Sequence, residues 1–189
     1  MLKIGFQKQL SQVVIDQAIE GDMSALEVVY LTYADACFSL AYRISQDQTL
    51  AQDIVHEAFI KIMNKICNFN NDGSFAGWIR RILVNETINR VKSNSILKLV
   101  ADTEVEESAS NDLFDFNWLI TCHDLDEILK NLPTQSRAVL LLHQVEGYTH
   151  KEIADLYGKS ESYSKVTLSR AYKSLKLIVL EQEKYNAFK

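Results

Sequence analysis

Apolar residues recur at intervals of three and four along most of the chain, which is the period of an amphipathic α-helix. One Pro and six Gly among 189 residues also favour helices over a turn-rich β protein. The pattern predicts helices over about 22–44, 49–66, 74–92, 125–132, 134–145, 149–157 and 160–178. The sequence therefore predicts an all-α fold.

Residues with capping chemistry mark the starts of the first two helices. Asp22 or Ser24 can cap the first, and Glu27 lies at capping-box spacing from Ser24. Thr49 and Gln52 repeat that spacing at the second helix. The positions of the first helix expected to face a core are Leu26, Val29, Tyr30, Tyr33, Cys37, Leu40, Ala41 and Ile44.

A polar loop over 68–73 precedes the third helix, and Ser74 is its expected cap. Residues 75–92 carry four Lys or Arg and one Glu. Aromatic rings beside Asn and Arg suit single-stranded nucleic acid, because bases stack on rings and amides hydrogen-bond base edges. For Trp78 a core position is favoured over base stacking.

The segment 149–176 predicts two short helices joined by a tight turn. Thr149 and Glu152 have capping-box spacing, Gly158 ends the first helix, and Ser160 can cap the second. Residues 159–176 carry five Lys or Arg and one Glu. This arrangement is typical of a DNA-binding helix-turn-helix, and an ordinary helical hairpin with a basic face is the alternative.

The net charge of −5 comes mainly from the middle of the chain. Residues 93–122 carry one Lys and six Asp or Glu, whereas the segments on either side are nearly balanced. The acid-rich, aperiodic part of this segment predicts a linker. We expect weak binding to duplex DNA by the chain alone, because few phosphates would be neutralised.

Other classes of protein find little support in the sequence. No run of eighteen apolar residues exists and the first residues lack a secretory core, so we expect a cytoplasmic protein without membrane insertion. The widely spaced Cys37, Cys67 and Cys122 predict buried reduced thiols. His56 and Glu57, or His123 with Asp124, could begin a metal-dependent hydrolase site, but no ligand set surrounds them. We expect no metal, no cofactor and no enzyme activity.

Three motifs in this order carry a resemblance: DIVHEAF in the second helix, GSFAGWIRRILVN in the third, and LP followed by EGYTHKEIADLYG before the last. Together they resemble bacterial RNA polymerase sigma factors of the extracytoplasmic-function (ECF) group. Residues 1–92 resemble the second conserved region, 123–189 the fourth, and 93–122 the variable linker between them. The resemblance covers about residues 21–178.

The resemblance implies a non-catalytic initiation factor of two small helical domains joined by the acidic linker. Its implied partners are core RNA polymerase, promoter DNA and an anti-sigma protein that holds the factor inactive. The linker would pass through the nucleic-acid channel of the polymerase. The alternative from the residues alone is a stand-alone helix-turn-helix transcription regulator, which would bind duplex DNA without polymerase.

Site residues follow from the same resemblance. The residues that would contact the clamp coiled coil of the largest polymerase subunit are Asp53, His56, Glu57 and Lys61. Binding of the minus-ten element, with capture of an unstacked base, falls to Asn70, Asn71, Asp72, Ser74, Arg81, Asn85 and Asn89. Reading of the minus-thirty-five element falls to Tyr163, Lys165, Val166, Ser169 and Arg170.

Three residues depart from the family pattern around the recognition helix. Lys159 follows the turn glycine where Ile is usual, Ser164 replaces a buried Val or Ile, and Thr167 stands where Arg is common. A serine between helices loses apolar burial of about 1–2 kcal/mol. We therefore expect a recognition helix that is either more loosely seated or reads an unusual sequence.

Overall fold

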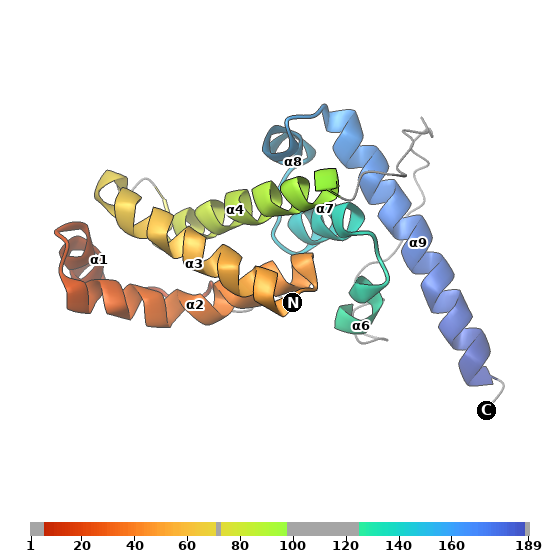
Figure 1. Cartoon of the computed structure of the whole chain (residues 1–189), viewed down its shortest axis with the longest axis horizontal. Coiled ribbons are helices and arrows are strands. Elements are labelled where there is room, and N and C mark those ends of the chain that lie inside the picture. Colours follow the sequence, from red (N-terminus) through yellow and green to blue (C-terminus); the bar gives the residue numbers. More distant parts are fainter. Residues whose placement is uncertain (1–5, 71–72, 98–124, 188–189) are drawn as a thin grey trace. The chain divides into compact units, whose positions relative to one another are not determined.

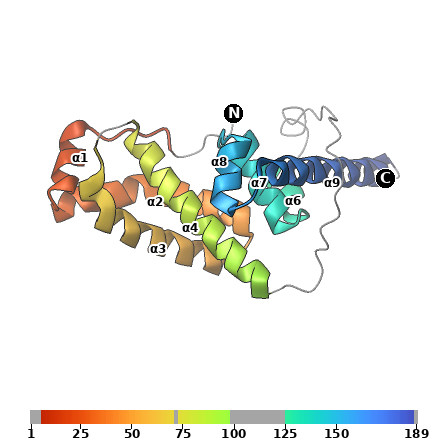
Figure 2. The same ribbon diagram turned by 90° about the horizontal axis from the view of Figure 1, so that it is seen from above.

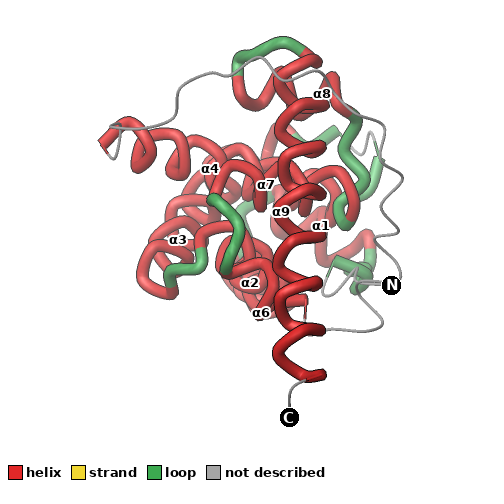
Figure 3. Tube along the Cα trace, turned by 90° about the vertical axis from the view of Figure 1, so that its right-hand side faces the viewer, coloured by secondary structure: helices red, strands yellow, loops and turns green. Residues whose placement is uncertain are grey.

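Helices make up almost all of the secondary structure in the computed structural model, which describes residues 6–70, 73–97 and 125–187 (Figure 1). Within those residues Figure 3 shows helices and loops without a strand. The predicted all-α class is confirmed. The chain divides into two compact units, Met1–Asn94 and Ser95–Lys189.

The first unit contains α1 (Gln12–Ile19), α2 (Met23–Ser45), α3 (Gln48–Lys65), the 3-10 turn η1 (Ile66–Asn68) and most of α4 (Phe75–Leu97). The second contains α6 (Leu125–Lys130), α7 (Thr134–Gln144), α8 (His150–Tyr157) and α9 (Glu161–Ala187). The boundaries of the predicted linker, 93–122, stay a prediction. Most of that segment lies outside the described residues.

Helix α1 has no counterpart among the predicted helices. It buries only Ile15 and Ala18, and the side chain of Ser11 at its start makes no capping hydrogen bond. So short a helix is marginal by itself, and tertiary packing must stabilise it. Its packing partner is α2.

The start of α2 is confirmed and that of α3 is corrected. The Ala25 N–H donates to Asp22 Oδ1 at 2.8 Å, so Asp22 is the cap of α2. The predicted cap at Thr49 is wrong, because the Leu50 N–H donates to Asp47 Oδ1 at 3.0 Å and Thr49 is the second helical residue. Aspartate caps at least as well as threonine, so the helix begins at the earlier residue.

The core of the first unit lies between α2, α3 and α4. Most of the predicted inward face of α2 is buried, but Tyr30 is 43% exposed and its ring meets Phe59 edge-on at 4.8 Å. Tyr30 therefore covers the edge of the core. In Figure 2 α4 crosses the α2–α3 pair, and it buries Ile79, Leu83, Val84 and Ile88.

Helix α4 starts as predicted and runs further. The Gly77 N–H donates to Ser74 Oγ at 3.4 Å, which confirms Ser74 as the cap. The helix continues past the predicted end near Lys92 to Leu97. The first residues assigned to the linker are therefore helical.

In the second unit a buried arginine joins α6 to α7. Pro133 separates the two helices, as predicted, and Arg137 is 3% exposed. Its Nη1 donates to the carbonyl oxygens of Leu129 at 3.1 Å and Leu132 at 3.0 Å. Burial lowers the pKa of Arg137 to about 10, so it stays charged at neutral pH while it caps the end of α6.

The helix-turn-helix forms from the predicted signals. The Glu152 N–H donates to Thr149 Oγ1 at 3.2 Å, and the Thr149 N–H donates to Glu152 Oε2 at 2.8 Å, which confirms the capping box. Gly158 has φ of 64°, a left-handed conformation that glycine adopts without strain. Helix α9 begins at Glu161, directly after Ser160.

Candidate nucleic-acid interfaces

The four residues expected to dock on polymerase fall into two groups on α3. Asp53 and His56 are exposed. Glu57 is partly exposed and Lys61 is exposed, and both also reach α4, where Lys61 Nζ forms an ion pair with Glu86 Oε2. Exposed Ile60 and Met63 lie at helical spacing from His56.

An ion-pair network joins α3 to α4. Glu86 Oε1 lies 3.7 Å from Arg90 Nε, and Arg90 Nη2 lies 4.0 Å from Glu57 Oε1. Sequence reasoning did not predict a role for Glu86 or Arg90. The available signal was the position of Glu86 between the apolar residues Val84 and Ile88, which places a carboxylate near the buried face.

Aromatic residues flank the loop before α4. Of the residues expected to capture a base, Asn70 and Ser74 are exposed, and Asn71 and Asp72 lie outside the described residues. Phe69 and Phe75 meet edge-on at 5.1 Å, and Phe75 stacks on the half-buried Trp78 at 5.7 Å. Trp78 thus packs against core rings while part of its surface stays exposed, and its predicted core position is met in part.

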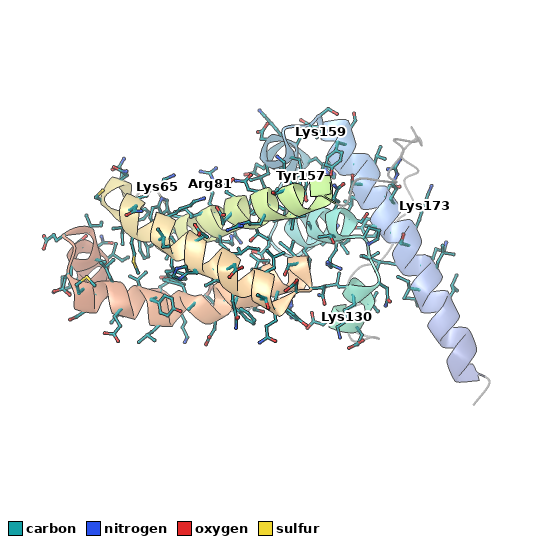
Figure 4. The ribbon with its side chains drawn as sticks, in the orientation of Figure 1. Lys65, Arg81, Lys130, Tyr157, Lys159 and Lys173 are labelled. Atoms are coloured by element: carbon teal, nitrogen blue, oxygen red, sulfur yellow. The ribbon has the colours of Figure 1, made fainter. Side chains whose placement is uncertain are left out.

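Exposed polar side chains form a stripe on α4. Arg81, Asn85 and Asn89 follow one another at intervals of four, and all three are exposed. Figure 4 shows Arg81 on this helix. The Asn85 Nδ2 donates to the Arg81 carbonyl oxygen at 2.8 Å, which orients the amide. An amide and a guanidinium on one face can bind phosphates and base edges together.

The residues expected to read the minus-thirty-five element differ in exposure. Lys165 is exposed and pairs with Glu161 at 3.5 Å. Val166, Ser169 and Arg170 are half-buried. Lys159 and Lys173, which Figure 4 labels, add exposed positive charge.

Tyr163 is engaged within the second unit. Its hydroxyl donates to Gln135 Oε1 of α7 at 3.3 Å, and its ring lies 5.3 Å from that of Tyr157. These contacts hold the start of α9 against α7 and α8. Tyr163 therefore supports the packing of α9 within this unit, and its expected contact with DNA stays a prediction.

Ser164 is completely buried between α8 and α9, and its hydroxyl is not left unsatisfied. Ser164 Oγ lies 3.0 Å from His150 Nδ1, and the His150 ring stacks on His143 of α7 at 4.4 Å. This polar contact thus compensates for part of the apolar burial that a Val or Ile at position 164 would provide. Thr167 is also buried, so it is a core residue here.

Both histidines of this stack have a lowered pKa. Burial lowers the pKa of His143, and the neighbouring His150 lowers it further. The pKa of His150 is lowered by burial and by Lys165, against an opposing effect of Glu161. The neutral imidazoles are therefore the forms that the folded unit favours.

Among the described residues, the structure adds no ligand to the metal sites that the sequence suggested. The described residues contain no group of three or more His, Cys, Asp or Glu able to hold a metal, and His123 and Asp124 lie outside them. Cys37 is buried, which raises its thiol pKa to about 12, but Cys67 is exposed, contrary to prediction, and Cys122 lies outside the described residues. Among the described helices none is long and apolar enough to cross a membrane.

Two family models match the chain in the predicted order. Residues 29–96 match Sigma-70 region 2 and residues 122–175 match Sigma-70, region 4, which together is more than half of the chain. The match to region 2 favours a sigma factor over the alternative of a stand-alone helix-turn-helix regulator. Both domains belong to regulatory DNA-binding proteins.

Characterised relatives are similar over most of this chain. ECF RNA polymerase sigma factor SigE of Mycolicibacterium smegmatis is 29% identical over 73% of this chain, which spans only 56% of that protein. RNA polymerase sigma-H factor of Pseudomonas aeruginosa is 27% identical over 78% of this chain and 82% of its own length. ECF RNA polymerase sigma-E factor of Escherichia coli is 26% identical over 76% of this chain and 80% of its own length.

Solved structures share the fold at low sequence identity. CnrH, in complex with the cytosolic domain of CnrY, has a TM-score of 0.51 at 19% identity and covers 88% of this chain and 95% of its own. The sigma factor RpoE of Bartonella quintana, in complex with the anti-sigma factor NepR, has a TM-score of 0.52 at 19% identity, over 81% and 95%. With sigma region 2 followed by region 4 and sigma factors among its relatives, the chain belongs to the ECF group of RNA polymerase sigma factors.

Proposed function

We propose that this chain binds core RNA polymerase in the cytoplasm, directs it to specific promoters and assists their opening. Helix α3 docks on the polymerase through Asp53 and His56. The stripe of Arg81, Asn85 and Asn89 on α4 binds the minus-ten element. The observation that carries the proposal is this exposed polar stripe on a helix of a region 2 domain.

The loop before α4 receives an unstacked base in this proposal. Asn70 and Ser74 are exposed at the two ends of this loop, and the rings of Phe69, Phe75 and Trp78 contact one another next to them in the sequence. The sequence assigns Asn71 and Asp72 to the same loop. Extruding a base costs a few kcal/mol, so binding energy from the polymerase has to help drive this step.

In the second unit α9 is the recognition helix. Lys165, Val166, Ser169 and Arg170 read the minus-thirty-five element, while Tyr163 supports the helix from within. A lysine or arginine in the major groove favours guanine, because both can donate to its O6 and N7. The basic residues Lys159 and Lys173 would add contacts to phosphates.

The proposed partners also include an anti-sigma protein. In the solved complex from Bartonella quintana, RpoE is bound to the anti-sigma factor NepR. For this chain the acidic linker is proposed to lie in the nucleic-acid channel of the polymerase. The protein acts by binding and has no catalytic site of its own in this proposal.

The test separates the two proposed interfaces. The wild-type chain is combined with bacterial core polymerase, and a promoter is selected from a randomised library by the reconstituted holoenzyme. Asp53→Ala is expected to raise the Kd for polymerase about tenfold, the loss of one well-placed contact. Lys165→Ala and Arg170→Ala should keep that Kd within about twofold and weaken promoter-specific initiation about tenfold.

Comparison of polymerase binding with promoter-specific initiation in the three variants decides whether the assigned roles hold. Equal loss of polymerase binding in all three variants would contradict the assigned roles. A wild-type chain that leaves the polymerase without promoter preference would contradict the proposed function itself. Lys151→Ala, an exposed change on α8, serves as the control and is expected to alter neither measurement.

A further inference from the structure

Glu86 is the single carboxylate of α4 and lies on the inner side of this helix. Its side chain is only 8% exposed, and its neighbours Thr87 and Ile88 are buried as well. A buried carboxylate is costly unless it is paired and hydrogen-bonded. The position of Glu86 therefore depends on the cations that reach it.

Those cations come from both helices. Lys61 extends from α3 to Glu86 Oε2, and Arg90, one turn further along α4, approaches Glu86 Oε1 at 3.7 Å. Arg90 also approaches Glu57 of α3 at 4.0 Å. Two acids and two bases, a pair from one turn of each helix, thus form a neutral network across the interface.

Rotation of α4 about its own axis would disturb this network. Glu86 and Arg90 each follow directly after Asn85 and Asn89, so the paired residues and the polar stripe lie about 100° apart around the helix. Rotation of α4 that turned the stripe away would pull Glu86 from Lys61. The inner pair therefore acts together with the buried apolar residues of α4 to oppose a rotation that would turn Asn85 and Asn89 away.

We propose that Glu86 is a positioning residue for the promoter-binding stripe of α4, and that Lys61 acts as its intrachain anchor instead of a polymerase contact. This inference rests on the proposed function, because it divides α3 into two parts. Asp53 and His56 serve the polymerase, and Lys61 with Glu57 serves α4. If Lys61 turned to an outside partner, the carboxylate of Glu86 would lose its closest cation.

The experiment measures polymerase binding and promoter opening separately on the full chain. The variants are Lys61→Met, Glu86→Gln and the double variant. Asp53→Ala is the reference for a polymerase contact, and Lys65→Met, an exposed lysine one turn further along α3, is the matched control. Promoter opening is followed by 2-aminopurine fluorescence in the minus-ten element, with enough protein to saturate the polymerase.

Lys61→Met and Glu86→Gln are expected to keep the Kd for polymerase within about twofold and to slow opening by the saturated holoenzyme about tenfold. The double variant should be no slower than the slower single variant, because the pair acts as one unit. Asp53→Ala should raise the Kd and open normally at saturation. Lys65→Met should match wild type in both measurements.

Two results would overturn the inference. One is a Kd raised by Lys61→Met as much as by Asp53→Ala, with normal opening at saturation. The other is normal opening by both single variants. If the wild-type chain binds no polymerase, the proposed function fails, and the pair is then tested by unfolding: additive losses in the Lys61 and Glu86 double-mutant cycle would overturn it, whereas coupled losses would support it.

Discussion

The two units of the chain stabilise their helices by different means. In the first, Tyr33, Phe69, Phe75 and Trp78 form a continuous cluster of rings, and the buried carboxylate of Glu86 pairs with Lys61 between α3 and α4. In the second, buried Arg137 donates to backbone carbonyl oxygens, and buried Ser164 contacts the His150 ring.

This difference has consequences for how each unit responds to change. An apolar core loses stability when volume is removed, and the loss depends little on pH. A core with buried donors and acceptors loses stability when one partner is removed or protonated. Substitutions of matched size should therefore separate the two units.

The largest effect is expected for Phe75→Ala in the first unit. Phe75 contacts the rings of Tyr33, Phe69 and Trp78, so its removal leaves a cavity and should cost about 4 kcal/mol of unfolding free energy. Calorimetry should show the transition of the first unit shifted alone. Leu31→Ala, at a 66% exposed position, should change stability by less than about 0.5 kcal/mol.

Arg137→Leu should have the next largest effect, confined to the second unit. The change leaves the carbonyl oxygens of Leu129 and Leu132 without their charged donor, at a cost of about 3 kcal/mol. Urea unfolding followed by NMR of each unit would measure it. A shift of both units by the same amount would contradict the assignment of this contact to the second unit.

A smaller effect is expected at the cap of α8. Thr149→Ala removes the capping box and should cost about 1 kcal/mol. Thr49→Ala is the matched control, because Thr49 lies inside α3 and alanine is the better helix former. Thermal unfolding should show a loss at Thr149 and none at Thr49, and equal losses would contradict the observed cap at Asp47.

The smallest effect is a pH dependence of the second unit. Because folding lowers the pKa of His143 and His150, the unfolded chain binds protons more readily. The stabilisation from the neutral imidazoles is complete above about pH 6.5 and is lost as the pH falls toward the folded pKa values. Urea titrations from pH 7.5 to 5 would measure this loss.

His143→Gln combined with His150→Gln is the matched variant for the pH experiment. Its second unit should show a flatter dependence between pH 7.5 and 5. An unchanged slope would mean that other groups cause the loss and would contradict the role of this stack.

Local signals in the sequence predicted much of this fold. Asp22, Ser74, Thr149 and Gly158 act within a few residues of themselves, so their chemistry could be interpreted without knowledge of the tertiary structure. Helix α1 was missed although Val14, Ile15, Ala18 and Ile19 recur at helical spacing, because it has only eight residues and no side-chain cap. Its stability comes from α2.

The contacts that sequence reasoning missed join residues far apart in the chain. Ser164 was expected to weaken the packing of α9, but the imidazole of His150 in the preceding helix contacts its hydroxyl. Lys61 was expected to face a partner, but Glu86 of the next long helix pairs with it. Periodicity places a residue on a face of a helix and does not identify its partner across the interface.

The most direct test of the central claim is a titration of the labelled chain with bacterial core RNA polymerase, with duplex DNA alone in a parallel cell. A sigma factor of this acidic composition should bind the polymerase tightly, bind free duplex weakly, and give the polymerase a promoter preference. Binding to duplex without binding to polymerase would contradict the account.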